Sequence, residues 1–398
     1  MKLLVVADGH YYTTPDGKVY ADSVYDYKFY ARYLKVFEEV CVVVRAEKVK
    51  EVPKNKKETS GEGLKFIFLP NYRGPIQYLK KYLEIRKCVK EVCKEYKCAI
   101  FRIPAATSNI FCKFFSKNKD SIFAVEVVTD PWENFGPRAT GNKFVLFIIR
   151  YMWTKLVKDM CKRADGVSYV TKYYLQKKYP SNKLKDSFTA SYSSVELSDN
   201  SYAKPRQWFD NQKKFYITHA ANYFSGYGKG HLTLMKAVKI VRDKGYDVNI
   251  KFIGDGPKKN EFLEYAKNLK IEKYVEFMGR LASGDEVRKI ISNSDIFILP
   301  TFAEGLPRVL LEAMAEGVPC LSSPVCGIPE ILDKEFLYLF EDSVGFASGI
   351  ENFINNPDIM TEQSKKNLTI AKEFSASILN EKRKEFYKKL KEKAQTKI

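Results

Sequence analysis

The feature of this sequence that most constrains its fold is an alternation of short apolar segments with longer segments of helical periodicity, which occurs twice. Buried strands that alternate with helices form parallel sheets covered by helices on both faces. The sequence therefore predicts an α/β protein with two doubly wound parallel sheets. The predicted strands are 3–7, 40–44, 66–69, 99–103, 122–128 and 167–170, followed by 215–219, 248–253, 275–278, 296–299, 319–322 and 337–340. The predicted helices include 23–39, 76–96, 143–163, 232–244 and 307–316.

The interval 193–214 is polar, contains no predicted strand and separates the two series. We therefore expect one domain over residues 1–200 and a second over 201–374, because a chain of 398 residues is too long for one ordinary core. Residues 375–398 form a basic amphipathic helix that we expect to pack back on the first domain. Ligands of such sheets bind at the carboxyl ends of the strands, so two facing domains would hold a ligand in the cleft between them.

The formal net charge of +19 is the strongest signal in the composition. Solvated basic faces in a lysine-rich proteome would account for it as well as a function would. The functional alternatives are nucleic acid, an anionic membrane surface or phosphorylated small substrates. The sequence contains no zinc finger, no RNA-recognition aromatic signature and no run of five Lys or Arg residues, so we expect no nucleic-acid partner.

The eight cysteines and three histidines show no metal-ligand spacing, so we expect reduced thiols and no bound metal. The first residues, "MKLLVVADGH", contain too short an apolar run for a signal peptide. The apolar run 144–149 ends at Arg150, far short of the roughly 18 residues of a membrane span. We therefore expect a cytoplasmic protein, at most peripheral on the inner face of the membrane.

The segment 300–330, "PTFAEGLPRVLLEAMAEGVPCLSSPVCGIPE", contains the most informative local pattern. Pro307 suits the first turn of a helix that follows the strand 296–299, and Gly317 suits its carboxyl end. The main-chain amides at the helix start could bind an anion such as phosphate, helped by the helix dipole. These amides belong to Gly305, Leu306, Arg308 and Val309.

Two glutamates flank this predicted anion site, Glu304 before the helix and Glu312 in its second turn. Carboxylates bind phosphate poorly but accept hydrogen bonds from hydroxyl groups, so the pattern suits a sugar on one side of a diphosphate and a ribose on the other. The alternative is a solvated stripe in which Arg308, Glu312 and a further glutamate pair along the helix, worth about 0.3–0.5 kcal/mol per pair.

The same segment resembles the Glu-x7-Glu signature of the family-4 (group 1) retaining glycosyltransferases. Further matches follow in family order: "YGKGHLTLMKAV", "IKFIGDGPKK", "YVEFMGRL" and the block that begins "ISNSDIFILP". The resemblance covers about residues 215–335 and implies the GT-B fold, two facing Rossmann-like domains with a cleft between them. The first half is similar, more faintly, to a bacterial surface-polysaccharide subgroup in "ADSVYDYKFYARYLKVFEEVCVVVR", "FAVEVVTDPWENF" and "ADGVSYVTKYYLQKKYP".

The resemblance implies roles for individual residues of the second domain. Glu304 would contact a hydroxyl of the donor sugar, and Glu312 would contact the ribose of the nucleoside. Lys229, in the Lys-Gly element, would neutralise the diphosphate and stabilise the leaving group as a point charge. Gly305, Leu306, Arg308 and Val309 would bind sugar and diphosphate through their amides.

The chain departs from the family pattern in both domains. The arginine that usually precedes the lysine is missing from "HAANYFSGYGKG", where Tyr223 is a donor-binding candidate, and Arg280 is a candidate for the second charge. A glycine pair usually follows the first strand, whereas this chain has Gly9 and His10 at the acceptor-side position. Asp130 ends a predicted strand where the family places a histidine or aspartate near the sugar, although an aspartate before proline also suits a turn.

We expect a nucleotide-sugar donor, UDP- or GDP-linked, no cofactor and no metal, since no Asp-x-Asp occurs in the sequence. The resemblance implies retention at the anomeric carbon and a lipid-linked or glycan acceptor of surface polysaccharide synthesis. The basic helices 74–97 and 142–163 suit an anionic membrane surface, but also a core-facing position. Two alternatives stay open: a transferase with a soluble acceptor, and a catalytically silent GT-B module that binds anionic ligands.

Overall fold

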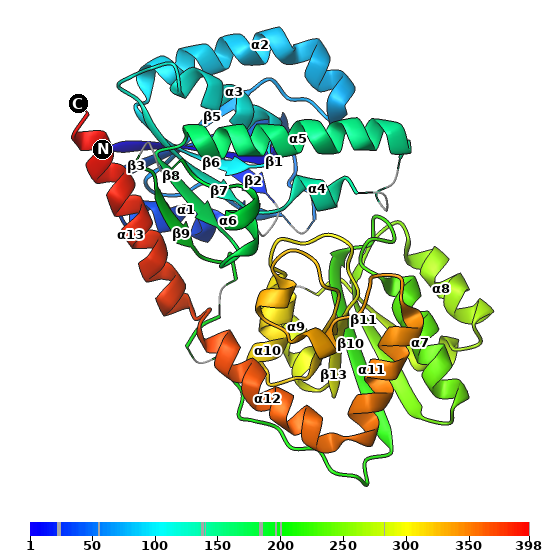
Figure 1. Cartoon of the computed structure of the whole chain (residues 1–398). Helices are drawn as coiled ribbons and strands as arrows, with labels where there is room; N and C mark the ends of the chain where they lie inside the picture. The colour runs from blue at the N-terminus through cyan, green and yellow to red at the C-terminus, as the bar shows by residue number, and fades with distance from the viewer. Residues whose placement is uncertain are drawn as a thin grey trace. The chain divides into compact units, whose positions relative to one another are not determined.

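The computed structural model describes residues 1–21, 25–54, 56–136, 139, 141–182, 186–195, 197–199, 201–281 and 283–397. The contacts within the chain divide it into two compact units. Unit 1 comprises Met1–Pro131, Tyr151–Tyr192 and Asn380–Ile398, and unit 2 comprises Trp132–Arg150 and Ser193–Leu379. Each unit is a parallel sheet with helices packed against it, as the alternating pattern predicts (Figure 1).

Nine strands of the described residues form the sheet of unit 1. Seven of them pair in parallel in the order β5-β3-β1-β6-β7-β8-β9, while β2 and β4 extend the sheet antiparallel from the end of β1. The strands are β1 (Lys2–Thr13), β2 (Val19–Ala21), β3 (Glu39–Lys48), β4 (Lys57–Glu58), β5 (Leu64–Leu69), β6 (Cys98–Ile103), β7 (Ile122–Val127), β8 (Gly166–Tyr169) and β9 (Phe188–Ser191). The helices that follow them are α1 (Tyr27–Leu34), α2 (Gly74–Glu95), α3 (Ala106–Phe115), α4 (Pro131–Asn134), α5 (Lys143–Arg163) and α6 (Tyr174–Lys178).

Five strands, all parallel, form the sheet of unit 2 in the order β12-β11-β10-β13-β14. They are β10 (Lys214–Tyr223), β11 (Asp247–Asp255), β12 (Val275–Gly279), β13 (Ile296–Leu299) and β14 (Cys320–Ser322). The helices are α7 (His231–Asp243), α8 (Lys259–Asn268), α9 (Gly284–Ser292), α10 (Arg308–Ala315), α11 (Ser343–Asn355) and α12 (Pro357–Lys372), with single 3₁₀ turns at Glu272–Tyr274, Ile328–Glu330 and Lys334–Phe336. Because neighbouring strands are parallel, the loops after β10, β11 and β13 meet at one edge of the sheet.

The last helix, α13 (Ala376–Gln395), belongs to unit 1 from Asn380 onward. Its buried side chains recur at helical spacing and include Arg383, Tyr387 and Leu390. The hydroxyl of Tyr387 donates to the buried Glu126 of β7 at 3.2 Å. This contact is made within unit 1, so α13 is part of the same core as the strands formed by the first residues of the chain.

The structure corrects several details of the sequence-based expectations. The predicted strand over 337–340 is wrong: Leu337 makes one isolated bridge to Ser322, and Asp342 then caps the amino end of α11, which leaves no length for a strand. The short strands β2, β4 and β9 were not predicted. The interval 193–214 belongs to unit 2, which also includes Trp132–Arg150. The helix predicted over 23–39 is observed as Tyr27–Leu34, with positions 23 and 24 outside the described residues.

Candidate functional site

The segment between β13 and α10 lies at the carboxyl edge of the unit 2 sheet. The predicted place of Pro307 is wrong by one residue, because Pro307 precedes the helix in an extended conformation with φ −69° and ψ 120°. The helix therefore begins at Arg308. Gly317 follows the helix with φ +64°, a left-handed conformation that glycine adopts without strain.

The amino end of α10 holds main-chain donors that have no acceptor. No side chain caps the helix. None of the hydrogen bonds among the described residues uses the amide of Gly305, Leu306, Arg308 or Val309 as donor. Gly305 and Leu306 are buried and Arg308 is exposed, so the set runs from the interior to the surface. With the helix dipole, these amides form an arrangement that suits an anion.

Lys229 and Glu304, which are 75 positions apart in the sequence, form an ion pair at this edge. The side chains are 35% and 25% exposed, so solvent reaches both. Among the described residues, neither the ammonium of Lys229 nor the carboxylate of Glu304 makes a second hydrogen bond or ion pair. A solvent-accessible pair of this kind contributes only about 0–1 kcal/mol, so a ligand can displace either partner at small cost.

Glu312 lies one turn into α10 and is partly buried. Burial raises the pKa of its carboxyl, and the nearby guanidinium groups of Arg308 and Arg288 oppose this rise. Among the described residues, the carboxylate of Glu312 makes no hydrogen bond or ion pair, and the alternative stripe with Arg308 forms no salt bridge. Glu312 is therefore a partly buried acceptor without a donor, which suits a ligand hydroxyl group better than a solvated stripe does.

The loop that carries Lys229 runs between β10 and α7 and packs closely on the loop after β13. The amide of Phe302 donates to the carbonyl of Gly228 at 3.2 Å. A Cβ atom at Gly228 would lie 2.2 Å from the Phe302 ring, and one at Gly230 would lie 2.3 Å from the carbonyl oxygen of Pro300. Glycine is required at position 230 because the two loops touch there through their main chains, whereas a side chain at position 228 would displace the Phe302 ring.

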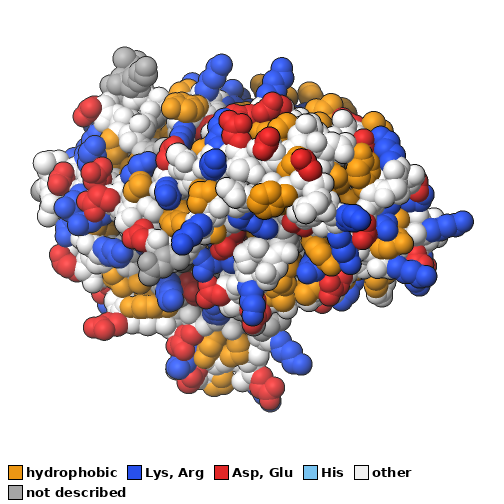
Figure 2. All heavy atoms as spheres, turned by 90° about the horizontal axis from the view of Figure 1, so that it is seen from below, with side chains coloured by type: hydrophobic (Ala, Val, Ile, Leu, Met, Phe, Trp, Pro, Cys, Tyr) orange, Lys and Arg blue, Asp and Glu red, His pale blue; other side chains and the backbone are white. Residues whose placement is uncertain are grey.

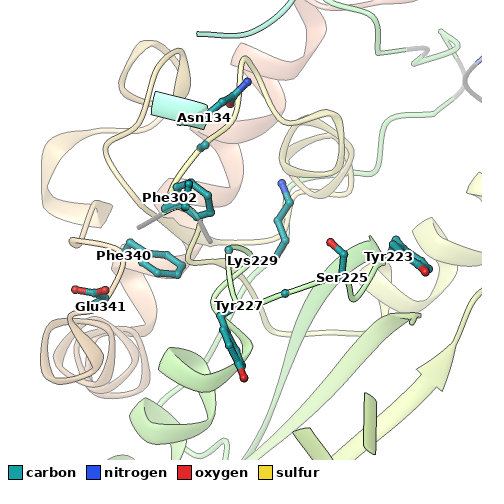
Figure 3. A pocket seen from close by; sticks show the side chains of 12 residues that line it. Asn134, Tyr223, Ser225, Tyr227, Lys229, Phe302, Phe340 and Glu341 are labelled. Atoms are coloured by element: carbon teal, nitrogen blue, oxygen red, sulfur yellow. The ribbon is translucent and has the colours of Figure 1, made fainter. Parts of the chain in front are cut away.

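A pocket of about 540 Å³ opens beside this loop, and all its lining residues belong to unit 2. In Figure 3, Phe302 and Phe340 lie on one side of Lys229, and Ser225 and Tyr223 lie on the other. Ala303, next to Glu304, also lines the pocket. The pocket thus combines aromatic faces, hydroxyl groups and one ammonium group, the chemistry that a phosphorylated sugar requires.

Arg280 and Tyr223, the two further donor-binding candidates, lie together. The guanidinium carbon of Arg280 is 5.8 Å from the centre of the Tyr223 ring, a cation–π contact. Tyr223 ends β10 and lines the pocket, while Arg280 follows β12 and is exposed. This contact holds a second positive charge near the pocket edge.

Asp130 has surroundings that differ from those of the other candidates. Its carboxylate in unit 1 is fully buried and accepts from Lys178 Nζ at 2.5 Å, Tyr174 at 2.9 Å and Tyr179 at 2.5 Å. These donors belong to α6 or follow it directly. In this structure Asp130 therefore anchors α6 and presents no exposed oxygen, and its catalytic role stays a prediction.

Gly9 and His10 were expected in a loop after the first strand, but both lie within β1, which continues to Thr13. The pairing of β1 with β3 shifts register between Val6 and His10, so the extra residues form an irregularity in the strand. A Cβ atom at Gly9 would lie 3.0 Å from the Tyr11 ring. The expected loop is thus a distorted strand end, and the acceptor-side role of these residues stays a prediction.

The sequence reasoning missed two buried histidines behind Lys229. His219 of β10 contacts the carbonyl oxygen of Lys229 through Nε2 at 2.6 Å, and its ring centre lies 4.5 Å from that of His231. Both side chains are buried. Burial lowers the pKa of His219 well below its ordinary value and that of His231 to about 3. A histidine inside the apolar strand "FYITHAA" is the signal that could have identified the first of them.

On the face in Figure 2, Lys and Arg side chains are interspersed with Asp and Glu rather than gathered in one patch. Among the described residues, no group of three or more His, Cys, Asp or Glu side chains is arranged to hold a metal ion. In the part of the chain that the structure describes, no helix is both long and apolar enough to span a membrane.

Residues 214–356 match the family model described as "Glycosyl transferases group 1". The chain is 28% identical over 363 residues to Protein CapJ of Staphylococcus aureus, covering 88% of each protein. It is 29% identical over 113 residues to WcaL of Escherichia coli (strain K12), a protein named as a glycosyltransferase of colanic acid biosynthesis; this match covers 27% of the chain and 28% of WcaL.

The fold is similar to that of HepE (Alr3699) of Anabaena, whose crystal structure contains UDP. The TM-score is 0.67 at 15% identity, and the superposition covers 97% of this chain and 99% of HepE. Together with the two parallel sheets, this similarity identifies the architecture as GT-B. The matched segment 214–356 contains Lys229, Arg280, Glu304 and Glu312. The chain therefore carries a group 1 glycosyltransferase domain and is related to enzymes of polysaccharide biosynthesis.

Proposed function

We propose that this protein is a retaining glycosyltransferase that moves a sugar from a nucleoside-diphosphate sugar to a lipid-linked or glycan acceptor in surface polysaccharide synthesis. The observation that carries the proposal is the accessible Lys229–Glu304 pair beside the uncapped amino end of α10. Two findings support a nucleotide ligand for unit 2. The crystal structure of HepE, which has a similar fold, contains UDP, and the glycosyltransferase family model matches residues 214–356.

The donor would bind with its charges matched to the site. Lys229 turns from Glu304 to the diphosphate, and the amides of Arg308 and Val309 bind a phosphate oxygen. Glu304, released from the ion pair, accepts a hydrogen bond from a hydroxyl group of the sugar. Glu312 accepts from the ribose, which supplies the donor that its buried carboxylate lacks. Arg280, held by Tyr223, adds the second positive charge in place of the missing family arginine.

In the reaction, the bond from the anomeric carbon to the diphosphate oxygen breaks, and a bond to the acceptor oxygen forms on the same face. The acceptor proton passes to the leaving phosphate, so no nucleophile from the protein is required. Lys229 and the α10 amides stabilise the negative charge that develops on the leaving group. We propose UDP or GDP as the nucleotide and a reaction without a metal ion.

The acceptor side of the proposal rests on two helices whose apolar side chains face solvent. On α2, Ile76, Leu79 and Leu83 are 70–75% exposed, and Lys87 and Lys90 share their face at helical spacing. Because Ile76, Leu79 and Leu83 are exposed rather than buried in a core, their position favours binding of α2 to a membrane surface over packing of this face against the protein. α5 exposes a similar apolar set near its amino end: Phe144, Val145, Phe147, Ile148, Tyr151 and Met152.

Apolar side chains ringed by lysines suit the headgroup region of an anionic bilayer, where a lipid-linked acceptor would be presented. We therefore propose a peripheral location on the cytoplasmic face of the membrane. Sedimentation with liposomes that contain anionic lipid, at low salt, tests it. Leu79→Asn with Leu83→Asn should abolish binding, whereas Leu263→Asn, at a 37% exposed leucine of α8, should not. Equal sedimentation of both variants would contradict this location.

Transfer and hydrolysis assays with a panel of UDP- and GDP-sugars, with and without lipid extract, test the catalytic proposal. Glu304→Ala should abolish turnover with little change in the melting temperature. Glu264→Ala is the matched control, because Glu264 is an exposed glutamate of α8 that pairs with Lys267. Transfer by Glu304→Ala at the wild-type rate would remove the site assignment. Nucleotide binding without turnover of any donor would favour the silent module.

A further inference from the structure

The two buried histidines, His219 and His231, do not take part in the proposed reaction, yet His219 contacts the main chain of Lys229 and His231 packs against His219. His219 lies in the middle of β10, the central strand of the unit 2 sheet, and is not exposed. Its Nε2 atom lies 2.6 Å from the carbonyl oxygen of Lys229. A carbonyl oxygen can only accept, so Nε2 carries the proton and His219 donates.

The other three nitrogens of the two histidine rings make no hydrogen bond among the described residues. His219 Nδ1 has no hydrogen-bond partner among the described residues, and neither do Nδ1 and Nε2 of His231. His231 packs instead as an aromatic ring, with its centre 4.5 Å from those of His219, Phe224 and Phe262. Both imidazoles are therefore neutral, because a proton added to either would be buried without an acceptor beside the positive charge of Lys229.

Among the described residues, the other hydrogen bonds of this loop hold the residues around Lys229 rather than its carbonyl oxygen. The amide of Gly230 donates to Tyr227 within the loop, and the amide of Phe302 donates to the carbonyl of Gly228. An ordinary apolar residue at position 219 would fill the core equally well but would leave the Lys229 carbonyl without its donor. A protonated histidine would supply a donor, but its charge would repel the Lys229 ammonium.

We infer that His219 is a positioning residue: its neutral imidazole, protonated at Nε2, fixes the main chain of Lys229 so that the ammonium group lies at Glu304 and the pocket. This inference rests on the proposed function for the role of Lys229 as a diphosphate ligand. The geometry that it describes is independent of that function. The ring of His231 packs against that of His219, and neither of its nitrogens makes a hydrogen bond among the described residues, so His231 provides an internal control.

The test measures the affinity of the purified protein for UDP and GDP by calorimetry, at a temperature where each variant is folded. His219→Phe should weaken binding of the nucleotide that the wild type prefers by about three- to tenfold, the equivalent of one net hydrogen bond. His219→Gln, whose amide nitrogen can occupy the place of Nε2, should restore most of the affinity. His231→Phe should bind as the wild type does.

A purely structural role would lower the melting temperature of His219→Phe without changing its affinity, and that result would overturn the inference. Nitrogen-15 NMR of the histidine rings gives a second measurement that needs no nucleotide. We expect His219 as the neutral Nε2–H tautomer from pH 8 down to pH 5.5. A His219 ring that titrates in this range, or carries its proton on Nδ1, would also overturn it. If the wild type binds neither nucleotide while the NMR result holds, the proposed donor fails and the anchoring of the loop stands.

Discussion

Each unit of this protein places a carboxylate after a buried parallel strand and brings a lysine to it, but the two pairs differ in surroundings. Asp130, after β7, is fully buried and accepts from Lys178 and two tyrosines. Glu304, after β13, is partly exposed, and its carboxylate contacts Lys229 alone among the described residues. Position at the carboxyl edge of a sheet therefore does not by itself distinguish a carboxylate that binds a ligand from one that stabilises the fold. The number of partners and the exposure of the pair do.

The largest expected difference concerns turnover. Lys229→Met should lower kcat/KM by about 10²–10³-fold, because it removes one preorganised positive charge from the leaving group. The melting temperature should change little, since an exposed ion pair contributes about 0–1 kcal/mol. Steady-state kinetics with the best donor, beside calorimetric melting, measure both. Lys267→Met is the control for loss of an exposed, paired lysine. Unimpaired turnover by Lys229→Met would place the two pairs in the same class.

The reverse pattern is expected in unit 1. Asp130→Asn keeps the shape of the side chain but leaves the Lys178 ammonium without its counter-charge, which should lower the free energy of unfolding by about 3 kcal/mol. Urea denaturation measures this loss. Nucleotide affinity of the folded variant should be unchanged. If Asp130→Asn were as stable as the wild type but inactive, Asp130 would act in the chemistry and the comparison would fail.

Acid is expected to weaken the support beneath the Lys229–Glu304 pair. The pKa of His231 is lowered to about 3 by burial, and that of His219 lies well below its usual value near 6.5. As pH falls towards and below 6.5, both histidines bind protons in the unfolded chain but not in the folded one. The folded state therefore loses stability, relative to neutral pH, as pH falls. Each histidine should cost about 1.3 kcal/mol between pH 7 and pH 5.5.

Urea denaturation at the two pH values checks this estimate. His231→Phe should remove its own share of the pH dependence. A wild-type slope that this substitution leaves unaltered would mean that His231 does not stay neutral in the folded protein.

The smallest expected effect concerns Glu312, whose carboxylate, unlike those of Glu304 and Asp130, pairs with no lysine among the described residues. Burial raises the pKa of its carboxyl, so the ionised form costs stability at neutral pH and the neutral amide of Glu312→Gln should not. We expect an equal or slightly higher melting temperature, with nucleotide affinity about tenfold lower if one ribose contact is lost. Calorimetry of binding and melting measures both changes. A lower melting temperature with unchanged affinity would make Glu312 structural.

Much of the fold could be predicted from the sequence, because buried parallel strands are continuous apolar runs such as "IFIL" and "IFAVEV". Of the three strands that escaped prediction, β2 and β4 are three and two residues long; β2 pairs with the end of β1, and β4 pairs with β2. The false strand at 337–340 failed for the opposite reason: its residues are apolar, but a single bridge at Leu337 is all that the neighbouring elements allow.

The candidate site was predicted in part. The spacing of Glu304, Glu312 and Gly317 places them around one short helix, which local rules describe well. The family resemblance assigned Lys229, Glu304, Tyr223 and Arg280 to one donor site, but the contacts of Lys229 with Glu304 and of Tyr223 with Arg280 were not predicted and come from the structure. The anchor at His219 was not predicted, because no local pattern shows that a strand residue meets the carbonyl of a loop ten positions later.

The sequence by itself determined the alternation of strands and helices and, to within one residue, the start and end of α10. These follow from periodicity and backbone preference, which act over a few residues. The tertiary structure alone decided which charged pair is accessible to a ligand, Lys229–Glu304, and which has a buried carboxylate, Lys178–Asp130. Exposure and partner number depend on how distant segments pack. Among the described residues, that packing gives Glu304 one accessible partner, whereas Lys178, Tyr174 and Tyr179 all donate to Asp130.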